Sequence, residues 1–258
     1  MNKSSMSAEW VRGVGYRPMA WLMLLMLAGI PQLAHSQCNR GMLHGLYGLA
    51  TQGIGPSGET VATLSVFDFS PDQRRVTEIY FVDTARGQRK STALGSYQIS
   101  PDCHFTLSVI DLSGRDYALE GEFNPNDHTV QVMQTVANDD SVAVGVIRRV
   151  GLNSCSASTV SRSYVFLSQG IDSGAYQARV GRLSSSRLGL DQTAETVNTA
   201  GVFSETAPAL LPITVGRHCL AELLDGGYPA VIVEGGQRLL YLGGGSGTIR
   251  TGQFISNR

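Results

Sequence analysis

Apolar and polar residues alternate with a period of two along most of the chain after residue 36. In the segment 104–111, Phe105, Leu107 and Val109 alternate with more polar neighbours, and Tyr117 and Leu119 do the same a few residues later. Such alternation is typical of a β-strand with one buried face and one wet face. Clusters of Gly, Pro, Asn, Asp and Ser separate these segments, and no stretch keeps a 3.6-residue period. The pattern therefore predicts an all-β protein.

The same pattern predicts eight strands in each half of the chain. In the first half they span 45–53, 61–69, 75–83, 91–99, 104–111, 116–123, 129–135 and 142–149. In the second half they lie near 163–170, 175–181, 187–191, 209–216, 218–224, 228–234, 237–242 and 248–255, with longer loops between 182 and 209. Eight short strands joined in order can close into a barrel without an exposed edge. We predict two tandem eight-stranded antiparallel meander barrels, lipocalin-like and packed together.

One stretch of sequence occurs twice and suggests how the two halves are related. CNRGMLHGLYGLATQGI begins at Cys38 and CSASTVSRSYVFLSQGI begins at Cys155, so that a Cys, a Tyr and a Gln-Gly-Ile recur at an offset of 117 (155 − 38). A further cysteine follows at Cys103 and Cys219, 65 and 64 residues later. A matching motif with a matching distant cysteine indicates a duplication. We expect a first repeat at 38–149, a link at 150–154 and a second, diverged repeat at 155–258.

Two segments of the second repeat break the alternation. Residues 230–233 (AVIV) and 239–242 (LLYL) are apolar on both faces. A strand with one wet face should alternate, so these strands need cover on both sides. The first repeat is the simplest cover, and a partner protein is the alternative.

The first 36 residues read as a secretory signal peptide. Lys3, Arg12 and Arg17 precede an apolar segment at 19–30, and small residues lead to a cleavage site after Ser36. The apolar segment has about twelve residues, whereas a membrane-spanning helix needs about 20. We predict an exported protein, periplasmic or extracellular, with no transmembrane segment in the mature chain.

Charge and cysteine content narrow the protein class further. The formal net charge is −1, which gives no electrostatic affinity for nucleic acid or anionic membranes. Four cysteines in an exported chain predict two disulfides, for which three pairings exist. Equal spacing favours Cys38–Cys103 and Cys155–Cys219, because each repeat then carries its own bridge.

The first repeat also carries a recognisable set of motifs. They are GLYGL (45–49), SVFDFS (65–70), GSYQISPDC (95–103) and GVIRR (145–149). Together they resemble a repeat of unknown function that is common in exported bacterial proteins and is similar in shape to lipocalin-like and allene-oxide-cyclase-like barrels. The resemblance covers 38–149 well and 155–258 poorly. Its motifs are structural, so it implies a fold rather than an activity.

The sequence contains no recognisable catalytic or metal-binding motif. In GGGSG (243–247), Thr248 replaces the second glycine of a nucleophile elbow centred on Ser246, so a hairpin turn is the better interpretation. The histidines after residue 36 lack the spacing of metal ligands: His44, His104, His128 and His218. Asp139 and Asp140 fit a solvated turn. We therefore predict no metal and no cofactor, and identify no catalytic residue.

Carboxylates within strands are the remaining candidates for chemistry. Asp68 and Glu78 lie next to apolar residues that should face the interior, so alternation places both acids in water. Glu120 and Glu122 are placed outward by the same rule. The recurring tyrosines, Tyr47 and Tyr164, are explained as packed residues at a barrel rim.

The leading functional hypothesis is a binding protein whose first barrel holds a small apolar molecule, because eight-stranded barrels can enclose one small ligand. Tyr117 is the one polar handle among the residues that alternation places inside. These ligand-binding candidates are Phe105, Leu107, Val109, Tyr117, Leu119 and Phe123. Two alternatives stay open: a structural or protein-interaction module with packed barrels, and a cyclase- or isomerase-like enzyme. The enzyme is the less favoured, because it rests on analogy alone.

Overall fold

Strands make up most of the chain in the computed structural model. The structure describes residues 38–73, 75–83, 93–111, 116–137, 141–160, 162–186, 189–224, 227–245 and 248–257. The expected signal peptide lies outside these residues, as do Asp139, Asp140 and Ser246. No helix within the described ranges is both long and apolar enough to cross a membrane.

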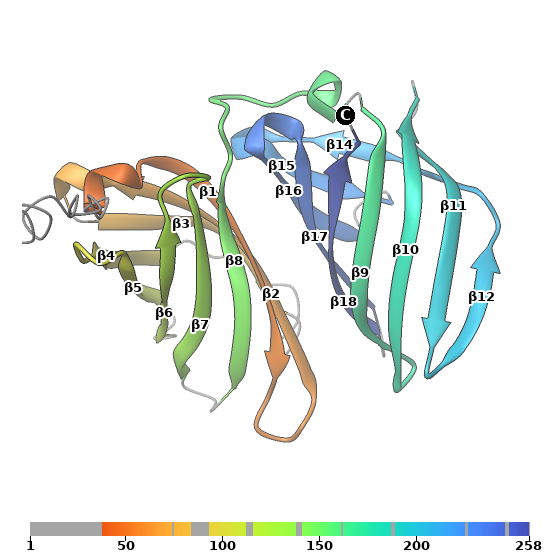
Figure 1. Ribbon diagram of the computed structural model, residues 1–258, viewed down its shortest axis with the longest axis horizontal. Helices are drawn as coiled ribbons and strands as arrows, with labels where there is room; N and C mark the ends of the chain where they lie inside the picture. Colours follow the sequence, from red (N-terminus) through yellow and green to blue (C-terminus); the bar gives the residue numbers. More distant parts are fainter. Residues whose placement is uncertain are drawn as a thin grey trace, which may run out of the picture. The chain divides into compact units, whose positions relative to one another are not determined.

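The first half forms a closed barrel of eight antiparallel strands in sequence order (Figure 1). Strand β1 pairs with β2 and also with β8, which closes the barrel between Tyr47 and Arg149. This confirms the predicted eight-stranded meander for the first half. The strands are β1 (Gly45–Ile54), β2 (Thr60–Ser70), β3 (Arg75–Asp83), β4 (Ala93–Ile99), β5 (His104–Asp111), β6 (Asp116–Asn124), β7 (Thr129–Ala137) and β8 (Val142–Arg149).

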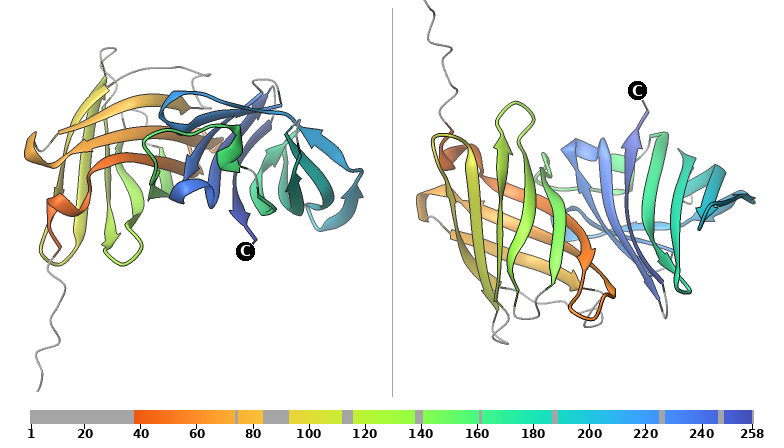
Figure 2. Two further views of the ribbon diagram at one scale, coloured as in Figure 1. Left: turned by 90° about the horizontal axis from the view of Figure 1, so that it is seen from above. Right: turned by 60° about the horizontal axis from the view of Figure 1, so that its bottom comes forward.

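The second half is a ten-stranded sheet and not the second eight-stranded barrel that the sequence predicts. Its order is β12-β11-β10-β9-β18-β17-β16-β15-β14, with β13 paired to β11 (Figure 2). The strands are β9 (Tyr164–Asp172), β10 (Ala175–Ser185), β11 (Leu190–Thr199), β12 (Val202–Thr206), β13 (Ala209–Leu211), β14 (Ile213–Val215), β15 (Leu220–Leu223), β16 (Tyr228–Val233), β17 (Arg238–Gly245) and β18 (Thr248–Ser256).

The error has a physical cause in the region where the sequence predicts loops. Strand β11 buries the polar side chains of Gln192 and Glu195 where alternation expects apolar ones, and β12 buries no side chain at all. A bulge at Thr193, which lacks a partner between Arg182 and Leu183 of β10, further disrupts the period in β11. The hydrophobic pattern of the sequence therefore does not predict these strands.

The two halves share features that fit the predicted duplication. The first strand of each half, β1 or β9, pairs with both the next strand and the last one. The disulfides join Cys38 to Cys103 and Cys155 to Cys219, as the spacing favours. The second cysteine of each bridge has a positive φ, 72° at Cys103 and 58° at Cys219. The duplication itself stays a prediction, whereas the two bridges indicate an oxidising, exported environment.

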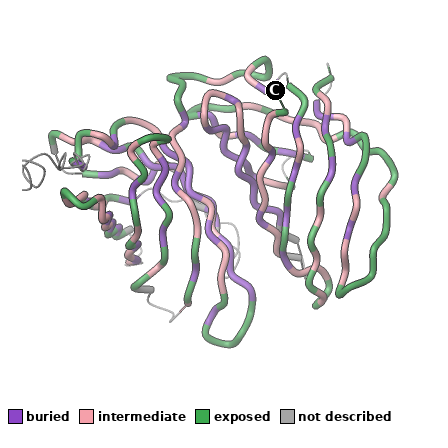
Figure 3. Tube along the Cα trace, viewed as in Figure 1, coloured by how far each residue is buried: buried purple, intermediate pink, exposed green. Residues whose placement is uncertain are grey.

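The apolar strands of the second half are covered on both faces, as expected. Along β16 and β17 most residues are buried, whereas β12 is exposed (Figure 3). The outer face of β2, with Leu64 and Val66, joins one apolar cluster with Val231 and Leu240. Gly48 permits this approach, since a Cβ there would lie 2.8 Å from Val231 Cγ1. The first half therefore provides the cover, and no partner is needed for it.

Polar contacts support the same packing. Arg148 on β8 forms an ion pair of 2.6 Å with Glu234, which also accepts a hydrogen bond of 2.7 Å from Arg238. The N–H of buried Val150 donates to the Leu46 carbonyl, and the Val150 carbonyl accepts from Gly235, both at 2.9 Å. The start of the predicted link is thus held by hydrogen bonds on both sides.

Candidate functional site

The interior of the first barrel differs between its two ends. At the end near the Cys38–Cys103 disulfide, aromatic side chains fill the space: Tyr47 packs edge-on against Phe69 with ring centroids 5.3 Å apart, and Phe69 packs against Tyr97 at 4.9 Å. Phe67 and Phe105 complete this cluster, and all five are at most 2% exposed. This end is a packed core.

Small side chains line the other end of the barrel. Thr51 and Ala143 are inward-facing and buried, and Ser65 and Ala93 are buried at the next level. The register places Gly53 opposite Ala143 and Gly145 opposite Thr51, which keeps large side chains out of these positions. Among the side chains that the structure describes, these inward residues are thus smaller than the aromatic ones at the other end.

Glu78 lies where these two ends meet, and its side chain is fully buried. Its Oε1 accepts a hydrogen bond of 2.6 Å from the Tyr117 hydroxyl and one of 3.0 Å from the Ser65 hydroxyl (the Glu78–Tyr117–Ser65 cluster). The prediction that Glu78 faces water is therefore wrong. The prediction for Asp68 is confirmed, since Asp68 is exposed.

A bulge explains why alternation fails for Glu78 and holds for Asp68. The β2–β3 register shifts between Val66 and Phe67, so that Val66 pairs with Tyr80 but Phe67 pairs with Glu78. Ile79 is the extra residue in β3. It reverses the inward–outward alternation of the side chains on either side of it. Glu78 consequently joins Phe67 on the inward face.

All six predicted ligand-binding residues face the barrel interior. Their exposed fractions are at most 8%, and Tyr117 has the highest value. Leu107, Leu119 and Phe123 belong to the packed apolar cluster, whereas Tyr117 reaches Glu78. The residues brought together are Phe105, Leu107, Val109, Tyr117, Leu119 and Phe123. The sequence predicts Tyr117 as an inward residue but does not predict its partner Glu78.

Burying a carboxylate is costly, and hydrogen bonds such as those from Tyr117 and Ser65 offset that cost. An ionised acid in an apolar environment loses several kcal/mol of hydration unless hydrogen bonds compensate. Replacing buried charged groups by well-packed apolar residues is often neutral or stabilising, so packing alone does not require a carboxylate here. Buried titratable groups with specific partners are common at functional sites. The Glu78–Tyr117–Ser65 cluster is therefore the candidate site.

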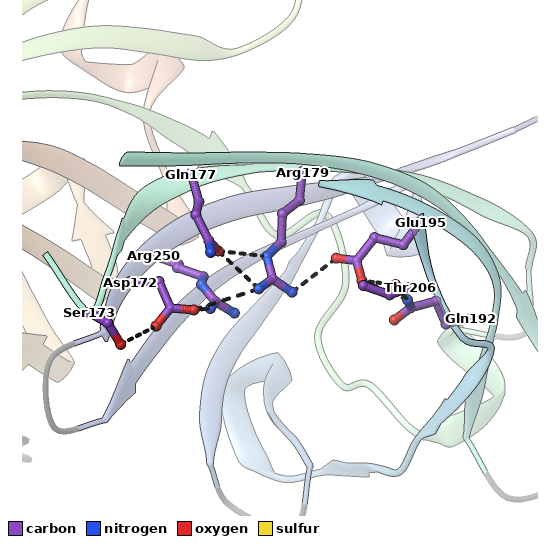
Figure 4. Close-up of polar contacts among 8 residues, drawn as sticks. All are labelled: Asp172, Ser173, Gln177, Arg179, Gln192, Glu195, Thr206 and Arg250. Atoms are coloured by element: carbon purple, nitrogen blue, oxygen red, sulfur yellow. Dashed lines mark hydrogen bonds and ion pairs between the residues drawn. The ribbon is translucent and has the colours of Figure 1, made fainter. Parts of the chain in front are cut away.

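A second polar cluster lies on one face of the second sheet (Figure 4). Arg179 on β10 is central: it forms an ion pair of 3.1 Å with Glu195, one of 3.7 Å with Asp172, and hydrogen bonds to Gln177. Arg250 on β18 also pairs with Asp172. Contacts among Gln192, Glu195 and Thr206 extend the network to β12.

This network ties five strands together and is balanced in charge. Two arginines face two carboxylates, so it has no net charge with which to attract an ionic ligand. Tyr241 lies close to it, stacked on Phe254 with ring centroids 5.0 Å apart. Burial raises the pKa of Tyr241, and the neighbouring Ser168 hydroxyl and arginines oppose that shift. We assign the network a structural role, because partly buried ion pairs hold β9–β12 and β18 in register.

The recurring tyrosines are packed residues, as predicted. Burial raises the pKa values of Tyr47 and Tyr164 to about 12, and that of Tyr97 to about 12 as well. Tyr164 donates a hydrogen bond of 2.8 Å to the Gly236 carbonyl, and Tyr97 donates one of 3.1 Å to the Leu43 carbonyl. Tyr97 and Tyr164 thus each anchor a strand to a neighbouring turn, whereas the Tyr47 hydroxyl is buried without a hydrogen-bond partner among the described residues.

The remaining sequence candidates have ordinary structural roles. Among the described residues, no group of three or more His, Cys, Asp and Glu side chains could hold a metal ion. His44 contacts Arg149, and His104 lies 3.6 Å from Glu122 at the surface. Glu120 and Glu122 are exposed, as alternation predicts. Gly245 on β17 pairs with Thr248 on β18, and the residues between them, where the sequence predicts a turn, lie outside the described ranges.

Comparison with known proteins adds no family assignment. No family model matches the chain, and no curated protein matches it. Among solved structures, kievitone hydratase from Nectria haematococca is 10% identical over 89% of this chain and 94% of that chain, with a TM-score of 0.30. An AttH candidate from Nitrosomonas europaea is 9% identical over 87% of this chain and 96% of that chain, with a TM-score of 0.24. Superpositions this loose carry no argument about activity.

Proposed function

We propose that this chain is an exported binding protein whose first barrel holds a small, largely apolar molecule with one hydrogen-bonding group. The buried Glu78–Tyr117–Ser65 cluster carries the proposal, because it combines a carboxylate and a phenol on an otherwise apolar inner wall. The small side chains beyond it, Thr51 and Ala143 among them, support the same location. The polar cluster would orient the ligand, and apolar burial would provide most of the affinity.

The aromatic end of the barrel fits a supporting role in this proposal. Its packed rings fix the positions of β1, β2 and β4, on which the inward residues near Glu78 are mounted. A rigid wall lowers the entropic cost of binding, because few side chains must be ordered when the ligand enters.

An enzyme of the isomerase or cyclase type is the second candidate, and the same carboxylate favours it. A buried glutamate that shares a hydrogen bond of 2.6 Å with a tyrosine could move a proton to or from an apolar substrate. The two proposals differ in what Glu78→Gln does. In a binding protein this nearly isosteric change affects affinity modestly, whereas in a proton-transferring enzyme it abolishes turnover.

The binding proposal is tested with 1-aminoanthracene, an uncharged apolar probe that carries one hydrogen-bonding group, an amine. We expect the fluorescence of the probe to rise on binding to the parent protein. Tyr117→Phe should weaken binding about fivefold, in line with about 1 kcal/mol for one neutral hydrogen bond. Ala143→Leu should abolish binding by filling the small end of the barrel. No response by the parent protein, or full binding by Ala143→Leu, would refute the proposal.

The position of the substitution that fills the barrel interior depends on the local backbone. Gly121 faces inward in the sequence pattern, but a Cβ there would lie 1.8 Å from the Gln131 carbonyl oxygen. Any side chain at this position disturbs the β6–β7 pairing instead of filling space. Ala143 already has a Cβ, so Ala143→Leu extends an existing side chain.

A further inference from the structure

A groove of about 1400 Å³ lies outside the barrel, between β1 and β6–β8 on one side and β9, β10 and β18 on the other. It is separate from the Glu78–Tyr117–Ser65 cluster, which points into the barrel. On its first wall Val144 is 60% exposed and Met133 is 49% exposed. On its second wall Tyr176 is 69% exposed and Leu167 is 44% exposed. Large apolar side chains are thus left in water on two facing walls.

These apolar residues form continuous surfaces on both walls. Val144 pairs with Met133 on one side and with Gln52 on the other. Leu167 pairs with Val180, which is 44% exposed and also lines the groove. Contiguous exposed apolar surface of this kind marks an interaction site in a soluble protein.

The floor of the groove is continuous with the packed contact between the two halves. Ala50 and Leu240 line the groove and also belong to the apolar cluster that joins β2 to β16 and β17. A hydrogen bond of 2.5 Å from the Thr251 hydroxyl to the Gln52 side chain links the walls at the same level. An occupant would therefore extend an apolar contact that the fold already makes.

The chemistry of the walls selects between kinds of occupant. Carboxamide side chains accompany the apolar ones on both walls, among them Gln131, Gln169 and Gln253. A carboxamide offers both donors and an acceptor, as a peptide group does. An acyl chain would bury these amides without giving them hydrogen bonds, which costs free energy for each amide. Charged lining residues carry both signs, so a strongly charged ligand is not favoured.

Size and shape favour a chain-like occupant. Sites for small molecules are about 300–1000 Å³, which is smaller than this groove. Successive side chains of an extended peptide point to opposite sides, so one set can contact each wall. Strands β1, β8, β9, β10 and β18 each pair on both sides, so their main chains offer no edge for strand addition. Recognition must come from the side chains of the walls.

We propose that this groove binds an extended, uncharged, apolar-rich polypeptide segment of a partner protein, held by apolar contacts and by glutamine side chains that pair with its main chain. The site is independent of the ligand proposed for the barrel interior. Tyr117→Phe and Ala143→Leu should therefore leave peptide binding unchanged.

The proposal is tested by fluorescence anisotropy with a short fluorescein-labelled peptide of Val, Leu, Ser and Gln. Leu167→Glu and Val144→Glu place a charge on each wall and should each weaken binding about tenfold or more. The matched control is Leu94→Glu on β4, since Leu94 is 66% exposed and does not line the groove. All three sites are solvent-exposed, and equal thermal unfolding midpoints would show that the fold is intact.

A second probe pair separates a peptide from a lipid. The same peptide with N-methylated main-chain amides should bind about fivefold more weakly for each hydrogen bond lost. A fluorescent fatty acid should bind poorly, and the wall variants should not change its binding. Tight fatty-acid binding that Leu167→Glu abolishes would overturn the peptide proposal. Equal loss in Leu94→Glu, or no binding of the peptide to the parent protein, would also overturn it.

Discussion

A single extra residue in β3 decides which way Glu78 faces. Alternation assigns the side of every residue relative to its neighbours, but the assignment reverses after a bulge. Asp68, on the unbulged strand β2, obeys the rule, and Glu78 does not. No residue type at Ile79 marks the bulge in advance. The inward direction of Glu78 therefore could not be predicted from the sequence, whereas the inward direction of its partner Tyr117 was predicted correctly.

The buried tyrosines predict how stability depends on pH. Tyr47, Tyr97 and Tyr164 have pKa values raised from 10.0 to about 12 by burial. In the unfolded chain they lose their protons near pH 10, but in the folded protein they keep them until about pH 12. The folded state therefore binds more protons in this window, and the free energy of unfolding should fall as the pH rises through it.

Urea unfolding at a series of alkaline pH values measures this effect. We expect a plateau below about pH 10 and a steep fall between about pH 10 and pH 12. Tyr97→Phe should make the fall shallower, because it removes one of the three groups. A free energy of unfolding that stays constant through the window would contradict the assignment.

At the level of elements, the sequence predicted strands well where one face is apolar and poorly where both faces are polar. The eight strands of the barrel follow the apolar alternation closely, and their order follows from short turns. Most of β11 escaped notice because Glu195 and Gln192 occupy inward positions and are satisfied by Arg179 and Thr206. Such a network cannot be predicted from the sequence, because its residues meet only once the strands are paired.

The doubly apolar strands β16 and β17 lead to a testable consequence. Val231, Val233 and Leu240 belong to the apolar cluster that includes Leu64 and Val66 of β2. A chain of residues 155–258 alone would expose that surface to water. We expect it to aggregate or to bind more of a hydrophobic dye than the chain from residue 37 onward, which should stay monomeric. A monomeric fragment that does not bind the dye would show that this surface needs no cover.

For the whole molecule, the two proposed binding surfaces arise from one arrangement. The closed barrel presents an inner wall with Glu78 and Tyr117, and its outer wall faces the second sheet across the groove. The inner site is enclosed by strands and suits a small ligand. The outer groove is large and open and suits a polypeptide. The two proposals rest on different residues and are refuted by different variants.

Native mass spectrometry of the protein purified from its own host tests the central claim most directly. The account predicts a bound small molecule on the parent protein, retained in Leu167→Glu and lost in Ala143→Leu. Tyr117→Phe should retain it at lower occupancy, because one hydrogen bond is removed. A parent protein that is free of any bound molecule, or a molecule that Ala143→Leu retains in full, would contradict a ligand site inside the first barrel.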